Sequence, residues 1–168
     1  MAYLIYLVFI LIFIFGFVIL FGAPYLPTLK KQVDTIFELL SLKTGQTMIE
    51  LGSGDGRVLV EAGKRGIKAI GYELNPILYL YSKFKTRKYN DVKVIWGNYW
   101  VKDWPETDAI FVFLLDRFMV KLNKKVIHKY SNPINLVSYA FKIPGRKINR
   151  SKNGMFLYKY NHRLKWYN

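Results

Sequence analysis

Three glycines at alternating positions form the part of this sequence best suited to hold a ligand. Residues 50–57 read Glu-Leu-Gly-Ser-Gly-Asp-Gly-Arg, between an apolar run typical of a strand and a segment typical of a helix. Gly52, Gly54 and Gly56 let the backbone turn tightly and let a ligand approach the main chain. In open α/β sheets, ligands bind at this end of the strands. The alternative is an ordinary strand-to-helix turn.

The residues around the loop exclude the two commonest phosphate-binding patterns. A dinucleotide fingerprint needs its third glycine at position 57, which is Arg, and no Gly-Lys-Ser/Thr follows the turn for a P-loop. Glu50 at the end of the preceding strand also disfavours a phosphate. A carboxylate among apolar residues needs a partner. The positively charged methionine amine of S-adenosylmethionine fits this position better.

A second carboxylate lies at the spacing expected for a ribose. Glu73 ends the next expected strand, 17 residues after Gly56, where a carboxylate can accept hydrogen bonds from both ribose hydroxyls. Asn98 follows the third strand and could accept a hydrogen bond from the adenine amino group. Asp55 and Asn75 could contact the cofactor or serve only as turn and cap residues. These positions together predict an S-adenosylmethionine site.

Apolar strands alternate with helices along residues 33–143, and this alternation is typical of a parallel sheet covered on both faces. The expected helices are 33–42, 57–65, 75–87 and 118–130, and the expected strands are 47–51, 68–74, 92–96, 108–115 and 135–143. Two further short runs, 147–150 and 155–160, flank residues 151–154, where Asn153-Gly154 is a strong hairpin signal. We predict a Rossmann-like, doubly wound α/β fold whose mostly parallel sheet ends in an antiparallel hairpin.

The glycine loop, together with Gly-Tyr-Glu-Leu-Asn-Pro over residues 71–76, resembles the class I S-adenosylmethionine-dependent methyltransferases. More narrowly, the chain resembles a family of small membrane-anchored protein-lysine methyltransferases, whose mitochondrial members modify the adenine nucleotide translocase and the ATP synthase c-subunit. The shared features are an apolar N-terminal segment, Pro-Tyr-x-Pro-Thr over residues 24–28, Asp-Gly-Arg in the loop and Glu-Leu-Asn-Pro over residues 73–76.

This resemblance implies roles for particular residues. Tyr25 and Thr28 would close over the cofactor, while Glu50, Glu73 and the loop would contact it. The predicted cofactor-binding residues are Tyr25, Thr28, Glu50, Gly52, Ser53, Gly54, Asp55, Gly56, Glu73, Leu74, Asn75 and Asn98. Asp116 ends the fourth strand, where the substrate approaches the methyl group in this fold, and is the predicted catalytic residue; the alternative is a cap of the following helix.

The N-terminus has the length and composition of a membrane span. Residues 1–29 hold no charged side chain, and residues 2–21 are apolar apart from one glycine and two tyrosines. About 20 helical residues cross the hydrocarbon core of a bilayer. A cleaved signal peptide would need a basic start and a small-x-small cleavage site, which this segment lacks. We expect a transmembrane helix over residues 1–23, a linker over 24–32 and a methyltransferase domain over 33–168.

The charge is also unevenly distributed. Residues 30–116 hold 13 basic and 11 acidic side chains, whereas residues 117–168 hold 13 basic side chains and no acidic one. On a tethered domain, this basic third would face anionic lipid headgroups. Nucleic acid is the competing partner, disfavoured because no nucleic-acid-binding motif is present. The absence of cysteine excludes disulfides, a thiolate zinc site and a cysteine nucleophile.

These observations predict a membrane-anchored protein-lysine N-methyltransferase that acts, as a monomer, on a membrane-associated protein. The alternatives are methylation of a lipid, quinone or other small molecule, and a tethered protein that binds the cofactor without turnover. Lys30-Lys31 after the apolar segment places the domain in the cytoplasm by the positive-inside rule. Lys outnumbers Arg 19 to 7, which favours an AT-rich prokaryotic genome and its inner membrane, with the mitochondrial inner membrane as the alternative.

Overall fold

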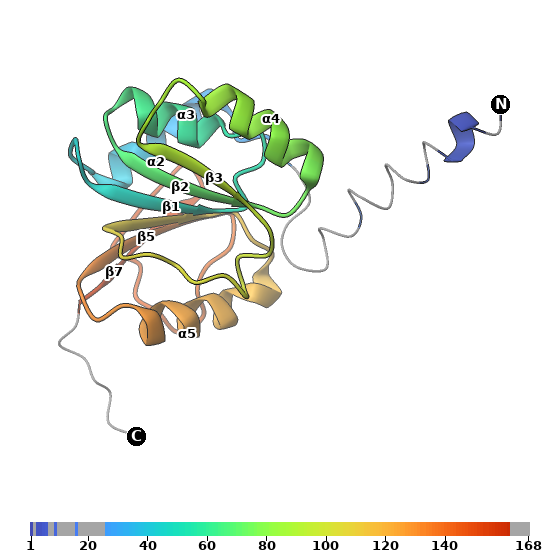
Figure 1. Cartoon of the computed structure of the whole chain (residues 1–168). Coiled ribbons are helices and arrows are strands. Elements are labelled where there is room, and N and C mark those ends of the chain that lie inside the picture. The colour runs from blue at the N-terminus through green and yellow to red at the C-terminus, as the bar shows by residue number, and fades with distance from the viewer. Residues whose placement is uncertain (2, 7–8, 10–15, 17–25, 162–168) are drawn as a thin grey trace.

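The computed structural model describes the chain except for residues 2, 7–8, 10–15, 17–25 and 162–168. Within the described part, a seven-stranded sheet has the order β3-β2-β1-β4-β5-β7-β6 (Figure 1). Its strands are β1 (Thr47–Leu51), β2 (Lys68–Glu73), β3 (Val92–Trp96), β4 (Ala109–Val112), β5 (Ile134–Tyr139), β6 (Arg150–Lys152) and β7 (Met155–Tyr160). The helices are α2 (Lys30–Leu40), α3 (Arg57–Lys64), α4 (Pro76–Thr86), the short 3₁₀ helix η1 (Asp116–Phe118) and α5 (Met119–Lys129).

The sheet reverses its order beside β1, and this reversal positions the site. β1 pairs in parallel with β2 on one side and with β4 on the other. β3 and β5 extend the parallel sheet outward, and β7 runs antiparallel to β5. The carboxyl end of β1 therefore lies at the topological switch point, where α/β sheets bind ligands. The predicted Rossmann-like fold is confirmed.

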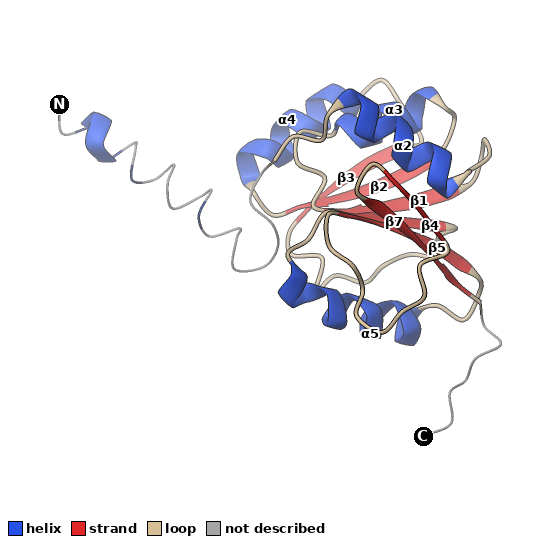
Figure 2. Ribbon diagram, turned by 180° about the vertical axis from the view of Figure 1, so that it is seen from behind, coloured by secondary structure: helices blue, strands red, loops and turns tan. Residues whose placement is uncertain are grey.

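Helices cover both faces of the sheet and close two apolar cores. α2, α3 and α4 lie on one face, and α5 lies on the other (Figure 2). On the first face, Ile36, Leu59 and Met48 are fully buried in one cluster. On the second, Leu122 and Trp104 are buried in a cluster with the opposite side chains of β1 and β4. Because both faces are covered, the central strands read as continuous apolar runs.

Two strands are shorter than the sequence predicts. β4 stops at Val112, where its neighbour β1 turns away into the glycine loop and offers no further partner. β5 stops at Tyr139 because Ala140 adopts a left-handed conformation with φ of 67°. The apolar residues that follow still enter the core, since Ile143 is buried and its amide donates to the Tyr158 hydroxyl at 2.9 Å. The predictions of strand at 113–115 and 140–143 are therefore wrong.

The C-terminal hairpin forms at the predicted turn. Asn153 and Gly154 have φ of 50° and 75° between β6 and β7, as a two-residue turn of the primed type requires. The strand expected before the turn over 147–150 is displaced, because β6 begins only at Arg150.

Most of the apolar N-terminal segment lies outside the described residues, so the predicted membrane span stays a prediction. Among the described residues, no helix is both long and apolar enough to cross a bilayer.

Candidate active site

The glycine loop joins β1 to α3 and adopts the tight turn that its sequence predicts. Gly52, Gly54 and Gly56 all have positive φ, at 88°, 54° and 75°. The amides of Gly52 and Ser53 both donate to the Tyr72 carbonyl at 2.9 Å, which fixes the loop against the end of β2. A Cβ atom on Gly56 would collide with the Ser82 hydroxyl of α4. The loop, β2 and α4 are therefore packed at backbone distance.

Glu73 is held at the end of β2 by backbone amides from both sides of the site. Its Oε2 accepts from the Gly54 amide at 2.7 Å and its Oε1 from the Asn75 amide at 2.8 Å. Burial raises the pKa of Glu73, although the hydrogen bonds from Asn75, Gly54 and Leu74 oppose this shift. A carboxylate offers about four acceptor positions, so two remain for further donors such as ribose hydroxyls.

Glu50 is the most unusual group of the site. It lies within β1 with 4% of its surface exposed, and its Oε2 has no hydrogen-bond partner. Burial raises the pKa of Glu50 well above its ordinary value, and the carboxylates of Asp55 and Glu73 raise it further, while Arg57 acts in the opposite direction. A buried carboxylate without a partner is costly, and a cationic ligand would offset that cost.

The other buried side-chain atoms without a partner in the described structure are found around the same loop. They are Ser53 Oγ, Asn75 Nδ2 and Ser82 Oγ. Asn75 uses its Oδ1 to cap α4, where it accepts from the amides of Ile77 at 2.9 Å and Leu78 at 3.2 Å, so its amide nitrogen is available for a ligand. Buried polar groups are normally paired, and this concentration of unpaired ones marks a binding site.

These groups fit S-adenosylmethionine. Glu50 offers a carboxylate oxygen for an ammonium group, and Glu73 offers acceptor positions for vicinal hydroxyls. Gly52 and Gly54 leave the backbone at the loop uncovered by side chains, which suits close approach of a ligand. The Leu74 carbonyl accepts from Trp96 Nε1 at 3.1 Å, and the predicted contact of Leu74 with the cofactor stays a prediction.

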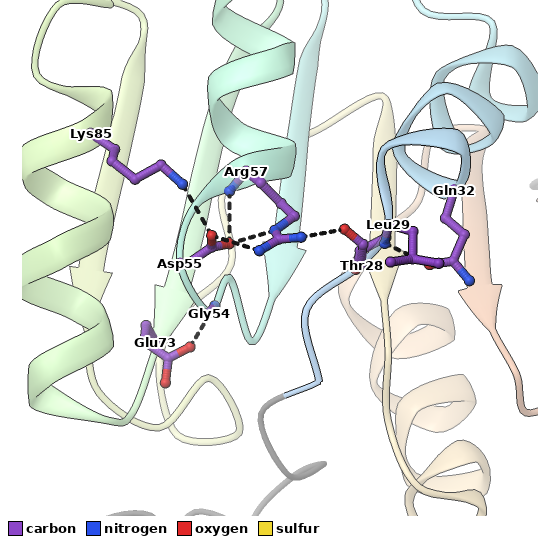
Figure 3. Close-up of polar contacts among 8 residues, drawn as sticks. All are labelled: Thr28, Leu29, Gln32, Gly54, Asp55, Arg57, Glu73 and Lys85. Carbon is purple, nitrogen blue, oxygen red and sulfur yellow. Dashed lines mark hydrogen bonds and ion pairs between the residues drawn. The ribbon is translucent and has the colours of Figure 1, made fainter.

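Asp55 is occupied by two cations. Arg57 donates to it through Nε and Nη2, both at 2.9 Å, and Lys85 donates from α4 at 3.0 Å (Figure 3). Burial acts to raise the pKa of Asp55, but the hydrogen bonds from Arg57 and Lys85 outweigh it, and the pKa lies below its ordinary value. Its place in the structure favours the turn-forming role that was the alternative to cofactor contact.

Arg57 extends this network to the segment that precedes α2. Its Nη1 donates to the Thr28 carbonyl at 2.6 Å, so one guanidinium joins the glycine loop to a residue 29 positions earlier (Figure 3). Thr28 is thereby buried beside the loop, whereas Tyr25 lies outside the described residues. Arg57 thus brings Thr28 to the site. In the sequence, Arg57 stands out only because a dinucleotide fingerprint would have a glycine at its position. The signal available in the sequence was its position directly after the loop.

Aromatic side chains follow β3 and reach the start of α5. The Tyr99 and Trp100 rings lie 5.0 Å apart between centroids, and Phe118 lies 5.9 Å from Trp100. Burial raises the pKa of the Tyr99 hydroxyl, and the nearby Glu73 raises it further. Asn98 accepts from the Trp100 amide at 2.9 Å through its side-chain oxygen, a contact typical of a turn. Its contact with adenine stays a prediction.

Asp116 lies at the start of η1, four residues beyond the end of β4, and its side chain is exposed. Glu50 and Glu73, by contrast, are buried. The neighbouring Arg117 guanidinium lies over the Phe118 ring at 4.8 Å. A substrate-facing role for Asp116 stays a prediction.

The sheet order, the glycine loop after β1 and the acid at the end of β2 define the class I fold of the S-adenosylmethionine-dependent methyltransferases. Residues 50–150 match the family described as the ANTKMT methyltransferase domain. The chain belongs to this family.

Similar proteins include lysine methyltransferases and one RNA methyltransferase. The human lysine N-methyltransferase of the ATP synthase c-subunit is 27% identical, over 72% of this chain and 53% of its own length. A protein-lysine N-methyltransferase of Saccharolobus islandicus is 29% identical, over 73% and 80% of the two chains. The structure of an RNA methyltransferase from Salinibacter ruber in complex with S-adenosyl-L-homocysteine superposes with a TM-score of 0.73, at 25% identity, over 80% and 92% of the two chains. This chain spans about half the length of the human relative.

Proposed function

We propose that this chain is an S-adenosylmethionine-dependent protein-lysine N-methyltransferase that acts on a membrane-associated protein. The observation that carries the cofactor assignment is the buried Glu50 carboxylate, which has an oxygen without a partner next to the glycine loop. The names of the human and Saccharolobus relatives support a lysine acceptor. The substrate named for the human relative is a component of the ATP synthase, which supports an acceptor at a membrane.

Each residue of the site has a role in this proposal. When bound, S-adenosylmethionine supplies a methyl group on a positively charged sulfur. Glu50 would hold the amino group of the cofactor, Glu73 the ribose hydroxyls, and the loop backbone would set its depth in the sheet. Methyl transfer to an amine needs the nucleophile, the methyl carbon and the sulfur in line, and needs no covalent bond to the protein. Positioning therefore supplies most of the acceleration.

The acceptor lysine has to lose its proton before it can react. A partly desolvated entrance lowers the pKa of a lysine ammonium, and the exposed Asp116 would orient the amine or accept its proton. Desolvation and a carboxylate act in opposite directions on an ammonium. The variant Asp116→Asn tests whether the carboxylate contributes to deprotonation of the lysine. An unchanged rate of methyl transfer would remove Asp116 from the mechanism.

The proposal includes a membrane anchor. The uncharged residues 1–29 would span the bilayer, and the basic residues 117–168 would contribute attraction to anionic headgroups. Part of that basic third is used within the domain, since Lys129 pairs with Asp103 and both Arg150 and Lys152 pair with Glu38. We place the domain on the cytoplasmic side of a prokaryotic inner membrane, with the mitochondrial inner membrane as the alternative.

RNA is the second candidate acceptor. It is favoured by the name of the Salinibacter structure, which this chain covers to 92%, and by the net charge of +15. A basic surface attracts phosphates without reading sequence. The same assay decides between the two acceptors.

The test is transfer of a labelled methyl group. The full chain is incubated with methyl-labelled S-adenosylmethionine and with membranes and RNA from the source cells, and protein, lipid and RNA are then separated. Label in a protein, mapped to lysine, is the expected result. Label confined to the lipid or to the RNA would identify that fraction, instead of a protein lysine, as the methyl acceptor. No label despite cofactor binding would leave a binding protein without turnover.

The control variants isolate the site. Glu73→Ala is expected to abolish transfer because it removes the carboxylate placed for the ribose. Glu61→Ala removes an acid of α3 that pairs with Lys64 and Arg65, away from the glycine loop, and is expected to retain transfer. Label that survives Glu73→Ala would contradict the assignment of the site.

A further inference from the structure

The helix α4 presents its apolar side to solvent. Ile77, Leu80, Tyr81 and Phe84 are 42%, 64%, 52% and 58% exposed. They recur at intervals of three and four residues and so form one stripe along the helix. The residues that α4 buries are instead Ser82 and Thr86. A stripe of this kind normally faces a core, and its exposure marks an interaction surface.

Basic side chains lie along and beyond the same stripe. Residues 74–90 hold four basic side chains and no acidic one. Lys83, Arg87 and Lys88 are exposed, while Lys85 is the one that pairs with Asp55. Arg87 lies over the Phe84 ring at 4.0 Å and Lys85 over the Tyr81 ring at 5.1 Å. The aliphatic stems of these cations therefore extend the apolar surface, and their charged ends border it.

The edge of the sheet continues this surface. Trp96 ends β3, is 57% exposed and stacks on Tyr79 of α4 with ring centroids 6.3 Å apart. A groove beside the second half of α4 is lined by Lys83, Arg87 and Lys93. Aromatic rings with a polar tip, next to apolar residues and cations, are the composition of surfaces that lie in a membrane interface.

The residues just before α2 are linked to α4 by a chain of polar contacts. The Thr28 carbonyl is held by Arg57, Arg57 pairs with Asp55, and Asp55 pairs with Lys85 of α4 (Figure 3). Leu26 and Leu29, on either side of this attachment, are 57% and 66% exposed. Thr28, near the end of the uncharged segment, is therefore linked to α4 through Arg57 and Asp55.

We propose that the α4 surface, formed by Ile77, Leu80, Tyr81, Phe84 and Trp96 with Lys83, Arg87 and Lys88, docks on the headgroup region of an anionic bilayer. The apolar stripe would enter the interface and the cations would contact lipid phosphates. A second copy of this chain fits the surface less well, since a two-fold contact would bring its basic residues against one another. This inference goes beyond the proposed function, because it holds for any methyl acceptor.

Such docking would give the domain a fixed orientation. α4 follows Glu73 and is capped by Asn75, so its N-terminus borders the cofactor site. A domain attached through α4 and through the segment at Thr28 would hold the carboxyl edge of its sheet near the lipid surface. Acceptor groups at the height of the headgroups would then meet the site.

The test measures the depth of α4 in the full chain. The sequence contains no cysteine, so Leu80→Cys provides a unique position for a nitroxide spin label. Ser151→Cys is the matched control, because Ser151 is exposed in β6, at the opposite edge of the sheet from β3. Both labelled chains are bound to vesicles of phosphatidylcholine with phosphatidylglycerol and to vesicles of phosphatidylcholine alone.

In the anionic vesicles, the label at position 80 is expected to become accessible to oxygen and protected from a water-soluble relaxation agent. The label at position 151 is expected to stay in water. The triple change Lys83→Glu, Arg87→Glu and Lys88→Glu should lower the submerged population of the label at position 80 at least fivefold. The pair Lys43→Glu and Lys68→Glu, at the amino ends of β1 and β2 and outside the basic residues 117–168, should leave it unchanged.

Several results would overturn the proposal. A label at position 80 that stays in water on anionic vesicles excludes docking through α4, as does a chain that fails to bind these vesicles. Protection that requires an added membrane protein would assign the surface to a protein partner, and protection that grows with chain concentration in the absence of vesicles would assign it to a second copy. None of these readouts depends on methyl transfer, so failure of the proposed function is seen separately.

Discussion

The helices α3 and α4 lie side by side on one face of the sheet and begin at the same site, yet they are built in opposite ways. α3 buries Val58, Leu59 and Ala62, and its residues Glu61 and Lys64 form ion pairs on its outer side. α4 buries Ser82 and Thr86 and directs Leu80 and its apolar neighbours outward. Each helix follows a strand that carries a site acid at its last or second-last position, Glu50 in β1 and Glu73 in β2.

The close packing at the loop explains this difference. Ser82 lies against Gly56 so tightly that a Cβ atom on the glycine would collide with its hydroxyl. A large apolar side chain at position 82 has no room there. The apolar residues of α4 are therefore placed on its other side, where they are free to serve an interaction. Closeness to the binding site has set the burial of α4, whereas core formation has set the burial of α3.

The same substitution in the two helices tests this comparison most strongly. Leu59→Ala removes a fully buried side chain of α3 and is expected to lower the free energy of unfolding by about 2–5 kcal/mol. Leu80→Ala removes a side chain that is 64% exposed and is expected to change it by less than about 0.5 kcal/mol. Urea unfolding of the full chain measures both. Equal losses would show that Leu80 is packed in the domain.

Glu50 and Glu73, the acids that precede the two helices, are expected to differ in their effects on cofactor binding and on stability. Glu50→Gln removes the charge from an oxygen without a partner and should weaken S-adenosylmethionine binding about 100-fold at little cost in stability. Glu73→Gln should weaken binding and also destabilise the fold, since an amide group cannot accept both backbone hydrogen bonds. Titration calorimetry and thermal unfolding separate the effects. A Glu50→Gln variant that binds normally would remove Glu50 from the site.

The pH dependence of stability follows from the raised pKa of Glu50. A carboxyl whose pKa is higher in the folded chain binds more protons there than in the unfolded chain, so its contribution to stability is present at low pH and is lost as pH rises through the folded-state value. The ligand-free chain should therefore lose stability between its ordinary carboxyl pKa and the raised one. Glu50→Gln is expected to make the thermal unfolding midpoint less dependent on pH over this range. The same pH dependence in the variant would contradict a raised pKa of Glu50.

The two cations that pair with Asp55 come one from each helix, and their removal is expected to weaken cofactor binding to different extents. Arg57→Gln breaks the link between Asp55 and the Thr28 carbonyl and is expected to weaken cofactor binding about tenfold. Lys85→Gln leaves that link in place and should have a smaller effect. Equal losses would indicate that charge at Asp55, rather than the attachment of Thr28, matters for binding.

The smallest effect is expected at the buried small residues. Ser82→Ala removes a buried hydroxyl without a partner from α4 and should leave the free energy of unfolding unchanged or raise it by up to about 1 kcal/mol. Ala62→Ser adds a hydroxyl at a fully buried position of α3 and should lower it by about 1 kcal/mol. A Ser82→Ala variant that loses stability would mean that its hydroxyl has a partner.

Much of the fold follows from local signals in the sequence. The apolar strands β1 and β2, the glycine loop and the Asn-Gly turn of the hairpin are each determined by neighbouring residues. The ends of β4 and β5 are set by where a partner strand leaves and by the conformation of Ala140, which are properties of the assembled sheet. The apolar pattern of α4 predicts a helix, but its orientation depends on the space left beside Gly56.

The candidate site divides in the same way. Glu50 and Glu73 are predicted as ligand contacts because they end strands next to a glycine loop, and the structure places both beside that loop. The contact between Arg57 and Thr28 joins residues 29 positions apart and exists only once α2 and α3 have packed. The ion pair of Asp55 with Lys85 also joins different elements, so no local spacing could indicate it.

The most direct test of the account is whether S-adenosylmethionine binding releases a proton from Glu50. Calorimetry of the full chain in buffers of different ionisation enthalpy, at a series of pH values from the ordinary carboxyl pKa upward, measures this release. We expect binding of S-adenosylmethionine and of S-adenosylhomocysteine, which share the amino group, to release a proton in the native chain but not in Glu50→Gln. Binding without proton release, or the same release in Glu50→Gln, would contradict the assignment of Glu50 as the residue that holds the cofactor.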